Sequence, residues 1–216
     1  MPQNRPPLRT LQLGLSALAG LLDATGFLIA NGYFVSFMSG NTTQLGVNAL
    51  DGIGSVLLPA GLIACFLGGV TTGAAVGWTS RKWPRTILLA ISLVLVSVAT
   101  AAYALGSTLG FLITTAFAMG LVNNVFLRDD RSSAGVTYMT GALVRIGQNF
   151  AARLMGQRDR IKPGYGALWL CLLAGAVLGT WLHTFDGAIG PIVAVTANAL
   201  LLVLAWRTEA RGDVQE

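Results

Sequence analysis

The sequence predicts an all-α membrane protein with six transmembrane helices, two re-entrant half-helices and two inverted repeats of three helices. Three observations carry this prediction: the hydropathy, the placement of the basic residues and an internal repeat. Of the 216 residues, 54% are hydrophobic and only 11% are charged, and the mean hydropathy is +0.66. A soluble domain has roughly a quarter of its residues charged. We therefore expect residues 1–216 to form a single transmembrane domain.

Long apolar runs account for the six expected crossings. About 20 apolar residues cross a hydrocarbon core of about 30 Å as a helix. The first run is too long for a signal-peptide core, so it is expected to be a retained first helix. The runs cover about 8–30, 55–80, 86–105, 107–127, 165–184 and 188–206.

Two further segments, 33–50 and 135–155, are poor candidates for helices that face lipid. Their apolar parts are short, and polar residues interrupt them, so we expect both segments to enter the membrane and return. The polar residues are Ser39, Asn41, Thr42, Thr43, Gln44 and Asn48 in the first segment, and Thr140, Arg145, Gln148 and Asn149 in the second.

The basic residues predict the orientation, because cytoplasmic segments carry the excess of Lys and Arg. If both short segments are re-entrant, thirteen of the fourteen Lys and Arg residues fall on one side, and Arg145 is the exception. Eight crossings would instead place Arg81, Lys82 and Arg85 on the other side. The charge pattern therefore predicts a multi-pass protein of the bacterial inner membrane with both termini in the cytoplasm.

An internal repeat relates the two halves, about 8–105 and about 107–206. A shift of 101 aligns residues 35–40 (VSFMSG) with 136–141 (VTYMTG), and a shift of 100 aligns 20–23 (GLLD) with 120–123 (GLVN). Three crossings per unit is an odd number, so the second unit should be inverted relative to the first. In transporters, such repeats place broken helices near the bilayer midplane, where they bind solute. A duplication that serves only packing is the alternative.

The repeated motif supplies candidate solute-binding residues at the start of each half-helix. Ser39 and Thr140 can cap exposed amides, and Gly40 and Gly141 let a ligand approach the backbone. The free N–H groups and the positive end of a helix dipole favour an anion or a carbonyl oxygen. Residues spaced three and four apart then make one face of each half-helix polar.

Arg145 and Asp23 are the two charged candidates. A cation near the membrane centre costs at least about 2.5 kcal/mol, so Arg145 either attracts an anion opposite its counterpart Gln44 or extends to the surface. Asp23 could pair with Arg145, couple transport to protons, or hydrogen-bond a helix terminus or Asn123. The complete predicted binding set is Asp23, Ser39, Gly40, Asn41, Gln44, Asn123, Thr140, Gly141, Arg145 and Asn149.

The motifs around 20–24, 34–41, 120–123 and 138–141 resemble those of the bacterial YoaK family of uncharacterised membrane proteins. The resemblance covers nearly the whole chain and implies a polytopic inner-membrane protein. Ser39 stands where that family usually has Thr, and Ala142 stands where Asn can follow in the second copy. These departures argue against a strictly symmetric site.

The function predicted from these observations is a transporter or channel-like facilitator for a small, anionic or polar solute bound at the midplane between the half-helices. A membrane scaffold or partner subunit is the first alternative, and an intramembrane enzyme is the second. We expect no enzyme, cofactor or metal site, because the sequence has no catalytic motif, no phosphate loop and one isolated histidine, His183. Nucleic acid is not an expected partner, since the basic residues lie in short connecting segments. The expected partners are the lipid bilayer and the solute, with a homodimer left open.

Overall fold

The computed structural model describes residues 6–80, 82–127, 137, 139–157, 161 and 163–212. The regular secondary structure of these residues is all helical, with no strand, and each expected segment contains one helix. This confirms the all-α prediction. The helices are α1 (Pro6–Ile29), α2 (Met38–Asn48), α3 (Ile53–Thr79), α4 (Pro84–Ala104), α5 (Thr108–Val122), α6 (Met139–Leu154), α7 (Tyr165–His183) and α8 (Ile189–Gly212).

Five of these helices are long and apolar enough to cross a membrane, namely α1, α3, α4, α7 and α8. The apolar run at 107–127 forms a helix of only 15 residues, α5, which spans about 22 Å at 1.5 Å per residue. It ends before Asn123 and Asn124, whose amide groups donate to backbone carbonyls of Met119 (2.8 Å) and Val70 (3.0 Å). Such bonds compete with continuation of a helix.

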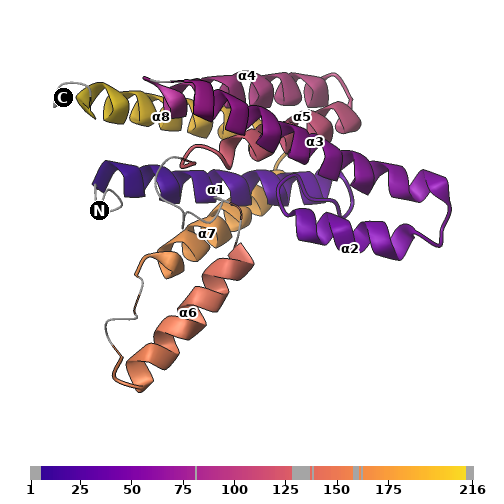
Figure 1. Cartoon of the computed structure of the whole chain (residues 1–216). Coiled ribbons are helices and arrows are strands. Elements are labelled where there is room, and N and C mark those ends of the chain that lie inside the picture. The colour runs from indigo at the N-terminus through magenta and orange to yellow at the C-terminus, as the bar shows by residue number, and fades with distance from the viewer. Residues whose placement is uncertain are drawn as a thin grey trace.

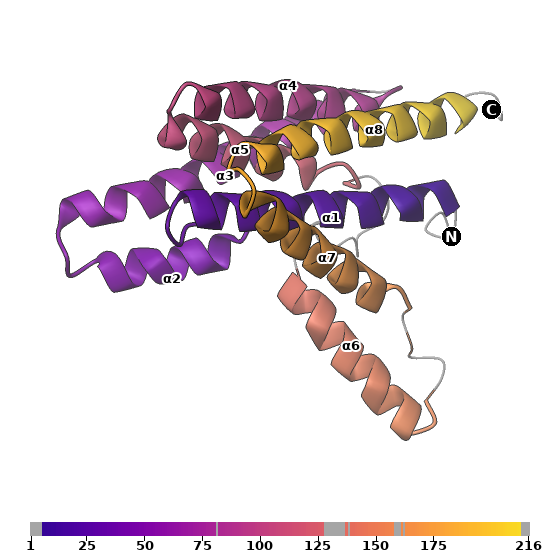
Figure 2. The ribbon, with the colours of Figure 1, turned by 180° about the vertical axis from the view of Figure 1, so that it is seen from behind.

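The short helices α2 and α6 project from the body of the molecule in different directions (Figures 1 and 2). Among the described helices, α2 packs only against α3, and α6 packs only against α7. α5 lies deep in the bundle between α3 and α4, and nine of its residues are buried. The short α5 is therefore covered by protein along most of its length.

The helix contacts have the same pattern in both halves. The contact between α1 and α7 has its counterpart between α5 and α3, and the contact between α1 and α8 has its counterpart between α5 and α4. The pair α2 and α3 likewise matches α6 and α7, and α3 with α4 matches α7 with α8. Two further contacts, α4 with α8 and α1 with α5, join helices that are equivalent to each other in the two halves.

α4 and α8 run antiparallel. At one end, the backbone N–H of Thr86 donates to Glu209 (3.0 Å), and at the other the Thr100 hydroxyl donates to the Pro191 carbonyl (3.4 Å). Between them, the Asn198 amide donates to the Ser92 hydroxyl at 2.8 Å. Because Ser92 and Asn198 are both buried, this bond fixes the crossing point inside the helix pair.

Glycines let the matching helix pairs approach to backbone contact. A Cβ on Gly20 would collide with the Leu172 carbonyl, and a Cβ on Gly120 would collide with the Phe66 carbonyl. Facing them, Gly175 adjoins the Ala17 carbonyl and Gly69 adjoins the Phe117 carbonyl. Small residues at such positions are typical of close helix packing in membranes.

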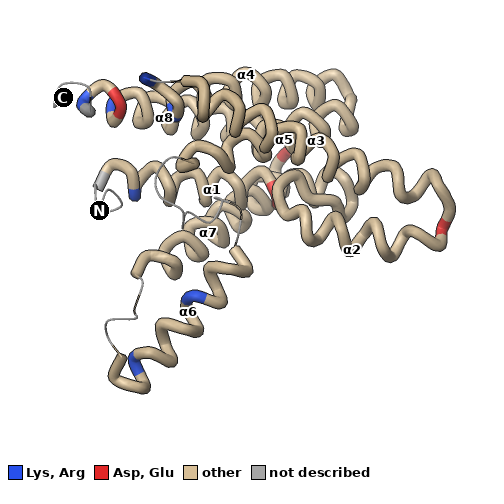
Figure 3. The backbone as a smooth tube through the Cα atoms, in the orientation of Figure 1, with Lys and Arg blue, Asp and Glu red and all other residues tan. Residues whose placement is uncertain are grey.

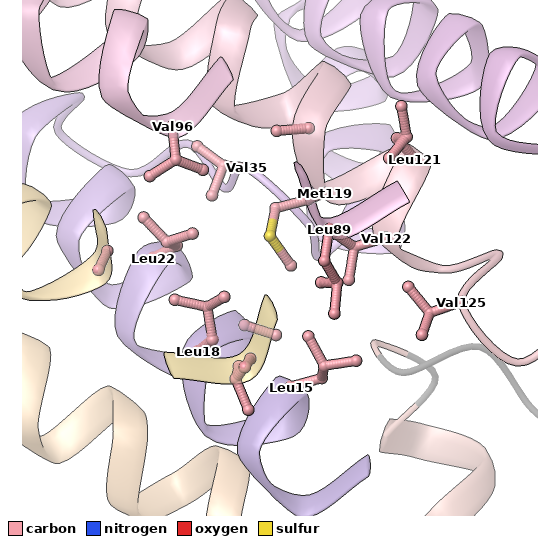
Figure 4. Close-up of a cluster of buried hydrophobic side chains, with 14 of the residues drawn as sticks. Leu15, Leu18, Leu22, Val35, Leu89, Val96, Met119, Leu121, Val122 and Val125 are labelled. Carbon is pink, nitrogen blue, oxygen red and sulfur yellow. The ribbon is translucent and has the colours of Figure 1, made fainter. Parts of the chain in front are cut away.

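The centre of the bundle is an apolar cluster (Figure 4). It includes Val35, which comes from the connection between α1 and α2 rather than from a helix and is fully buried. That connection therefore returns into the protein after α1 ends. Other members shown in the figure are Leu15, Leu18, Leu22, Leu89, Val96, Met119, Leu121, Val122 and Val125.

Most of the charged residues lie near the ends of the helices, whereas Asp23 lies within α1 and Arg145 within α6 (Figure 3). The start of α1, the start of α4 and the end of α8 lie together and carry Arg9, Lys82, Arg85, Arg207 and Arg211. We call this the basic end. Of the other basic residues used to predict the orientation, Arg153 lies on α6. The rest lie outside the described residues, at positions 5, 81, 128, 131, 158, 160 and 162.

Candidate functional site

The Asp23 carboxylate holds the connection that leads from α1 to α2. Its Oδ1 accepts hydrogen bonds from the backbone N–H groups of Val35 (3.0 Å), Ser36 (2.7 Å) and Phe37 (3.3 Å). Its Oδ2 accepts a short hydrogen bond from the Ser36 hydroxyl. A carboxylate is a strong acceptor for such amides. Among the roles weighed for Asp23, this geometry favours hydrogen bonding to a helix terminus.

This arrangement changes the interpretation of the first half-helix. The sequence suggested that free amides near the start of α2 attract an anion from outside the protein. Three amides that lead into α2 already bind an anion, and that anion is the side chain of Asp23. We therefore do not place an external anion at this position.

Ser39 and Gly40 do not have the roles that the motif suggested. α2 begins at Met38, so Ser39 is its second residue, is exposed and does not cap the helix, and Phe37 precedes the helix without a side-chain cap. A Cβ on Gly40 would approach the rings of Phe37 (2.6 Å) and Phe34 (2.8 Å). Gly40 therefore makes room for this aromatic pair rather than for a ligand.

The polar face of α2 is occupied by bonds within the protein. Asn41 is fully buried, accepts from the Phe34 N–H (3.0 Å) and donates to the Phe34 carbonyl (2.7 Å). Gln44 donates to the Gly32 carbonyl (3.4 Å), and Asn48 donates to the Tyr33 hydroxyl (3.0 Å). These amides hold α2 against the returning connection.

In the second half, Asn123 takes the place of Asp23. Its Oδ1 accepts from the Thr137 N–H (3.3 Å) and the Thr137 hydroxyl (3.1 Å). The residue that matches Asn41 is Ala142, which is buried but cannot hydrogen-bond through its side chain. Thr140 is the second residue of α6 and is exposed, and Gly141 follows it in the first turn.

Arg145 lies on the side of α6 that faces the protein. At 100° per residue, Arg145 and Asn149 share one side of the helix with Ala142 and Ala152, and both alanines are buried. Arg145 is nevertheless exposed, and it donates to Gln148 Oε1 at 3.2 Å. The opposite side of α6 is apolar and exposed, with Leu143, Phe150 and Leu154 at 48%, 63% and 74% exposure.

The structure brings some predicted residues together and separates others. Asp23 meets the motif that leads into α2, and Asn123 meets the matching Thr137. α2 and α6 do not contact each other among the described helices. Arg145 therefore does not face Gln44 across a narrow gap in this structure, and the described partners of Asp23 are the residues 35–37.

Sequence reasoning missed the residues that donate the hydroxyl hydrogen bonds to Asp23 and Asn123. Ser36 and Thr137 were aligned by the repeat but were not chosen, although each carries a hydroxyl 13 or 14 residues after Asp23 or Asn123. The equivalent positions of Ser36 and Thr137 in the two repeats could have identified both residues. Glu209 was also missed: it lies at the basic end, where its carboxylate accepts from the N–H groups of Arg85 (2.9 Å) and Thr86 (3.0 Å).

Comparison with known proteins places the chain in a family. The model of the family described as "Protein of unknown function (DUF1275)" matches residues 11–206. A UPF0700 transmembrane protein of Rhizobium meliloti is 36% identical over 206 residues, covering 93% of this chain and 87% of the relative. No solved structure matches the chain significantly. The family match spans both repeats and all eight helices in whole or in part, so this chain belongs to the DUF1275 family.

Proposed function

We propose that this protein transports a small polar or anionic solute across the bacterial inner membrane by means of two inverted three-helix repeats. The observation that carries the proposal is that the first helix of each half packs against the last two helices of the other half in a matching pattern: α1 against α7 and α8, and α5 against α3 and α4. The antiparallel course of α4 and α8 adds to this. Two units inserted in opposite orientations can exchange their conformations, and in transporters this exchange exposes a site to each side in turn.

The course of α4 and α8 supports six crossings rather than eight. If all eight helices crossed in turn, successive helices would alternate in direction. α4 and α8 would then run in the same direction, because they would be the fourth and eighth crossings. If α2 and α6 are re-entrant, α4 and α8 run in opposite directions, as the bonds at their two ends require. The basic end would then lie in the cytoplasm together with both termini.

The second half-helix is the better candidate for contact with solute. The polar side chains of α2 are bonded to the connection before it, whereas Arg145 is exposed on the protein-facing side of α6. A guanidinium group binds carboxylate or phosphate oxygens through paired N–H donors. We therefore place the solute-binding group at Arg145, with Gln148 beside it, rather than midway between α2 and α6.

The test is uptake by proteoliposomes of a panel of small anions and polar metabolites, with and without a pH gradient. Loss of a charge-assisted hydrogen bond costs about 1.5–3 kcal/mol, so Arg145→Gln should lower the uptake of a transported anion by about tenfold or more. Arg153→Gln is the matched control, because Arg153 is an exposed arginine near the other end of α6.

Two results would count against this proposal. If both arginine variants transport like the wild type, Arg145 does not contact the solute. If the wild type takes up nothing from the panel faster than empty liposomes do, transport of this solute class fails. Folding of each variant is checked by its thermal transition in detergent.

A membrane scaffold is the second candidate, and the packed centre favours it. Apolar side chains from α1, α4, α5 and α8 pack together in the described core (Figure 4). A transporter must reopen this contact during its cycle, whereas a scaffold keeps it closed. Paired spin labels on α4 and α8 would show one fixed distance in a scaffold and two in a transporter.

A further inference from the structure

The end of the bundle opposite the basic residues contains the one histidine of the chain, His183. It is the last residue of α7, and a short turn joins it to α8. Tyr103, in the last turn of α4, reaches the same turn from the first half of the molecule. The Thr100 hydroxyl, one helical turn earlier, donates to the Pro191 carbonyl and holds α4 against the start of α8.

Gly187 lies between the two side chains. A Cβ on Gly187 would collide with the Tyr103 hydroxyl and would lie 3.5 Å from Nδ1 of His183. The phenol and the imidazole are therefore close neighbours that adjoin the same glycine. Tyr103 is further positioned by Phe111 of α5, whose ring centroid lies 5.7 Å from its own.

Nδ1 of His183 is buried and has no hydrogen-bond partner among the described residues. A buried polar atom without a partner is unfavourable, because it has given up its hydrogen bonds to water. In neutral imidazole one ring nitrogen carries a hydrogen and the other carries a lone pair. The polar group that adjoins the same glycine is the Tyr103 hydroxyl. After a small movement it could accept a hydrogen bond from a proton on Nδ1, or donate its own hydrogen to a lone pair there.

The surroundings can accept a positive ring. His183 lies at the C-terminal end of α7, where the helix dipole favours a cation. In the turn, Asp186 supplies a carboxylate, one oxygen of which accepts from the Ala188 N–H at 2.7 Å. The charged residues on the described parts of the helices packed against α7 are Arg9 near the start of α1, Asp23 on α1, whose carboxylate is held by residues 35–37, Arg145 and Arg153 on α6, and Arg207, Glu209 and Arg211 at the far end of α8.

We propose that His183 binds a proton at Nδ1 and that the protonated ring then donates a hydrogen bond to the Tyr103 oxygen. This bond would join α4, from the first half, to the turn between α7 and α8, from the second half. It thus couples a proton to the contact between the two repeats. The inference deepens the proposed function by naming the proton as the coupling ion, and it rests on that function only for this last point.

The direct test follows Tyr103 by NMR in the full-length protein in detergent. The Cζ carbons of the four tyrosines are labelled with ¹³C, and Tyr103→Phe identifies the Tyr103 signal. Histidine ordinarily gains its proton between about pH 5 and pH 8. Over that range the Tyr103 signal should move in the wild type and stay in place in His183→Gln.

Thr184→Ala is the matched control, because Thr184 follows His183, is exposed and bonds only the Trp181 carbonyl among the described contacts. This variant should keep the pH response of Tyr103. A Tyr103 signal that is constant in the wild type, or that moves equally in His183→Gln, overturns the proton site. If His183→Gln does not fold, Tyr103→Phe is the second test variant, because it removes only one oxygen atom. The NMR signals of the His183 ring are then the readout.

Proteoliposome uptake separates this inference from the proposed function. If solute uptake depends on a pH gradient in the wild type and loses that dependence in His183→Gln, the proton is the coupling ion. If uptake occurs with the same pH dependence in both proteins, coupling through His183 is wrong while transport stands. If no uptake occurs but Tyr103 responds to His183, the proton site stands and the transport proposal fails.

Discussion

The connection from α1 to α2 and the connection from α5 to α6 occupy matching places in the two halves, and different side chains hold them. Asp23 accepts three backbone N–H groups and one hydroxyl in the first connection. Asn123 accepts one N–H and one hydroxyl of Thr137 in the described part of the second. The same geometry is thus built once with a charge and once without.

The two half-helices differ in the same sense. α2 has no basic or acidic residue, and its buried Asn41 bonds the connection before it. α6 has Ala142 at the matching position and carries two exposed arginines. The comparison teaches that one copy of the duplicated motif is an internal anchor, while the other carries exposed arginines.

The largest effect should come from the feature that the halves share, the close helix contacts at glycine. Gly20→Ala and Gly120→Ala each place a Cβ against a backbone carbonyl, so each should destabilise the protein by about 3 kcal/mol or more. Gly46→Ala and Gly147→Ala are matched controls with open space around them. Thermal unfolding in detergent is the measurement. Tolerance of either core variant would show that the paired helices do not approach to backbone contact.

The next effect should separate the two connections. Asp23→Ala leaves three backbone amides and the Ser36 hydroxyl without an acceptor, which should cost about 2–3 kcal/mol. Asn123→Ala releases only the two described donors of Thr137 and should cost about 1–2 kcal/mol. The shifts in melting temperature of the two variants give the comparison. Equal shifts, or a larger shift for Asn123→Ala, would contradict the view that the first connection is the anchored one.

A smaller effect should follow when α2 is made to resemble α6. Asn41→Ala introduces the residue that α6 has at this position and leaves the N–H and carbonyl of Phe34 without their partners. The expected loss is about 1–3 kcal/mol, again from thermal unfolding. Ser39→Ala, two residues earlier and exposed, should change the melting temperature little. If the two variants behave alike, the Asn41 bonds contribute nothing to the anchor.

The smallest effect should arise at the basic end, where Glu209 of α8 binds the start of α4. Glu209→Gln keeps one acceptor oxygen and replaces the other with an NH2 group, so either Arg85 or Thr86 loses its acceptor, and the charge at the positive end of the helix dipole is removed. The expected cost is about 1 kcal/mol and should decrease at high salt. A melting temperature that is equal in the variant and the wild type at low salt would show that the charge is not needed.

The sequence predicted the helical segments well because hydropathy is a local property. Each of the eight segments contains one helix, and the motif at Asp23 and Asn123 pointed to the two connections that the structure joins by hydrogen bonds. The site was predicted less well. Ser39 was chosen as a cap and Ser36 was overlooked, although the two differ by only three positions, because the choice depends on where α2 begins.

By itself, the sequence determined the membrane class, the position of each helix and the duplication, since all three follow from composition and spacing along the chain. Only the tertiary structure decided which oxygen meets which amide. Asp23 lies 12 to 14 residues from its partners, and Glu209 lies more than 120 residues from the helix that it binds. Such meetings depend on how the helices pack, and packing is set by the whole chain rather than by any one segment.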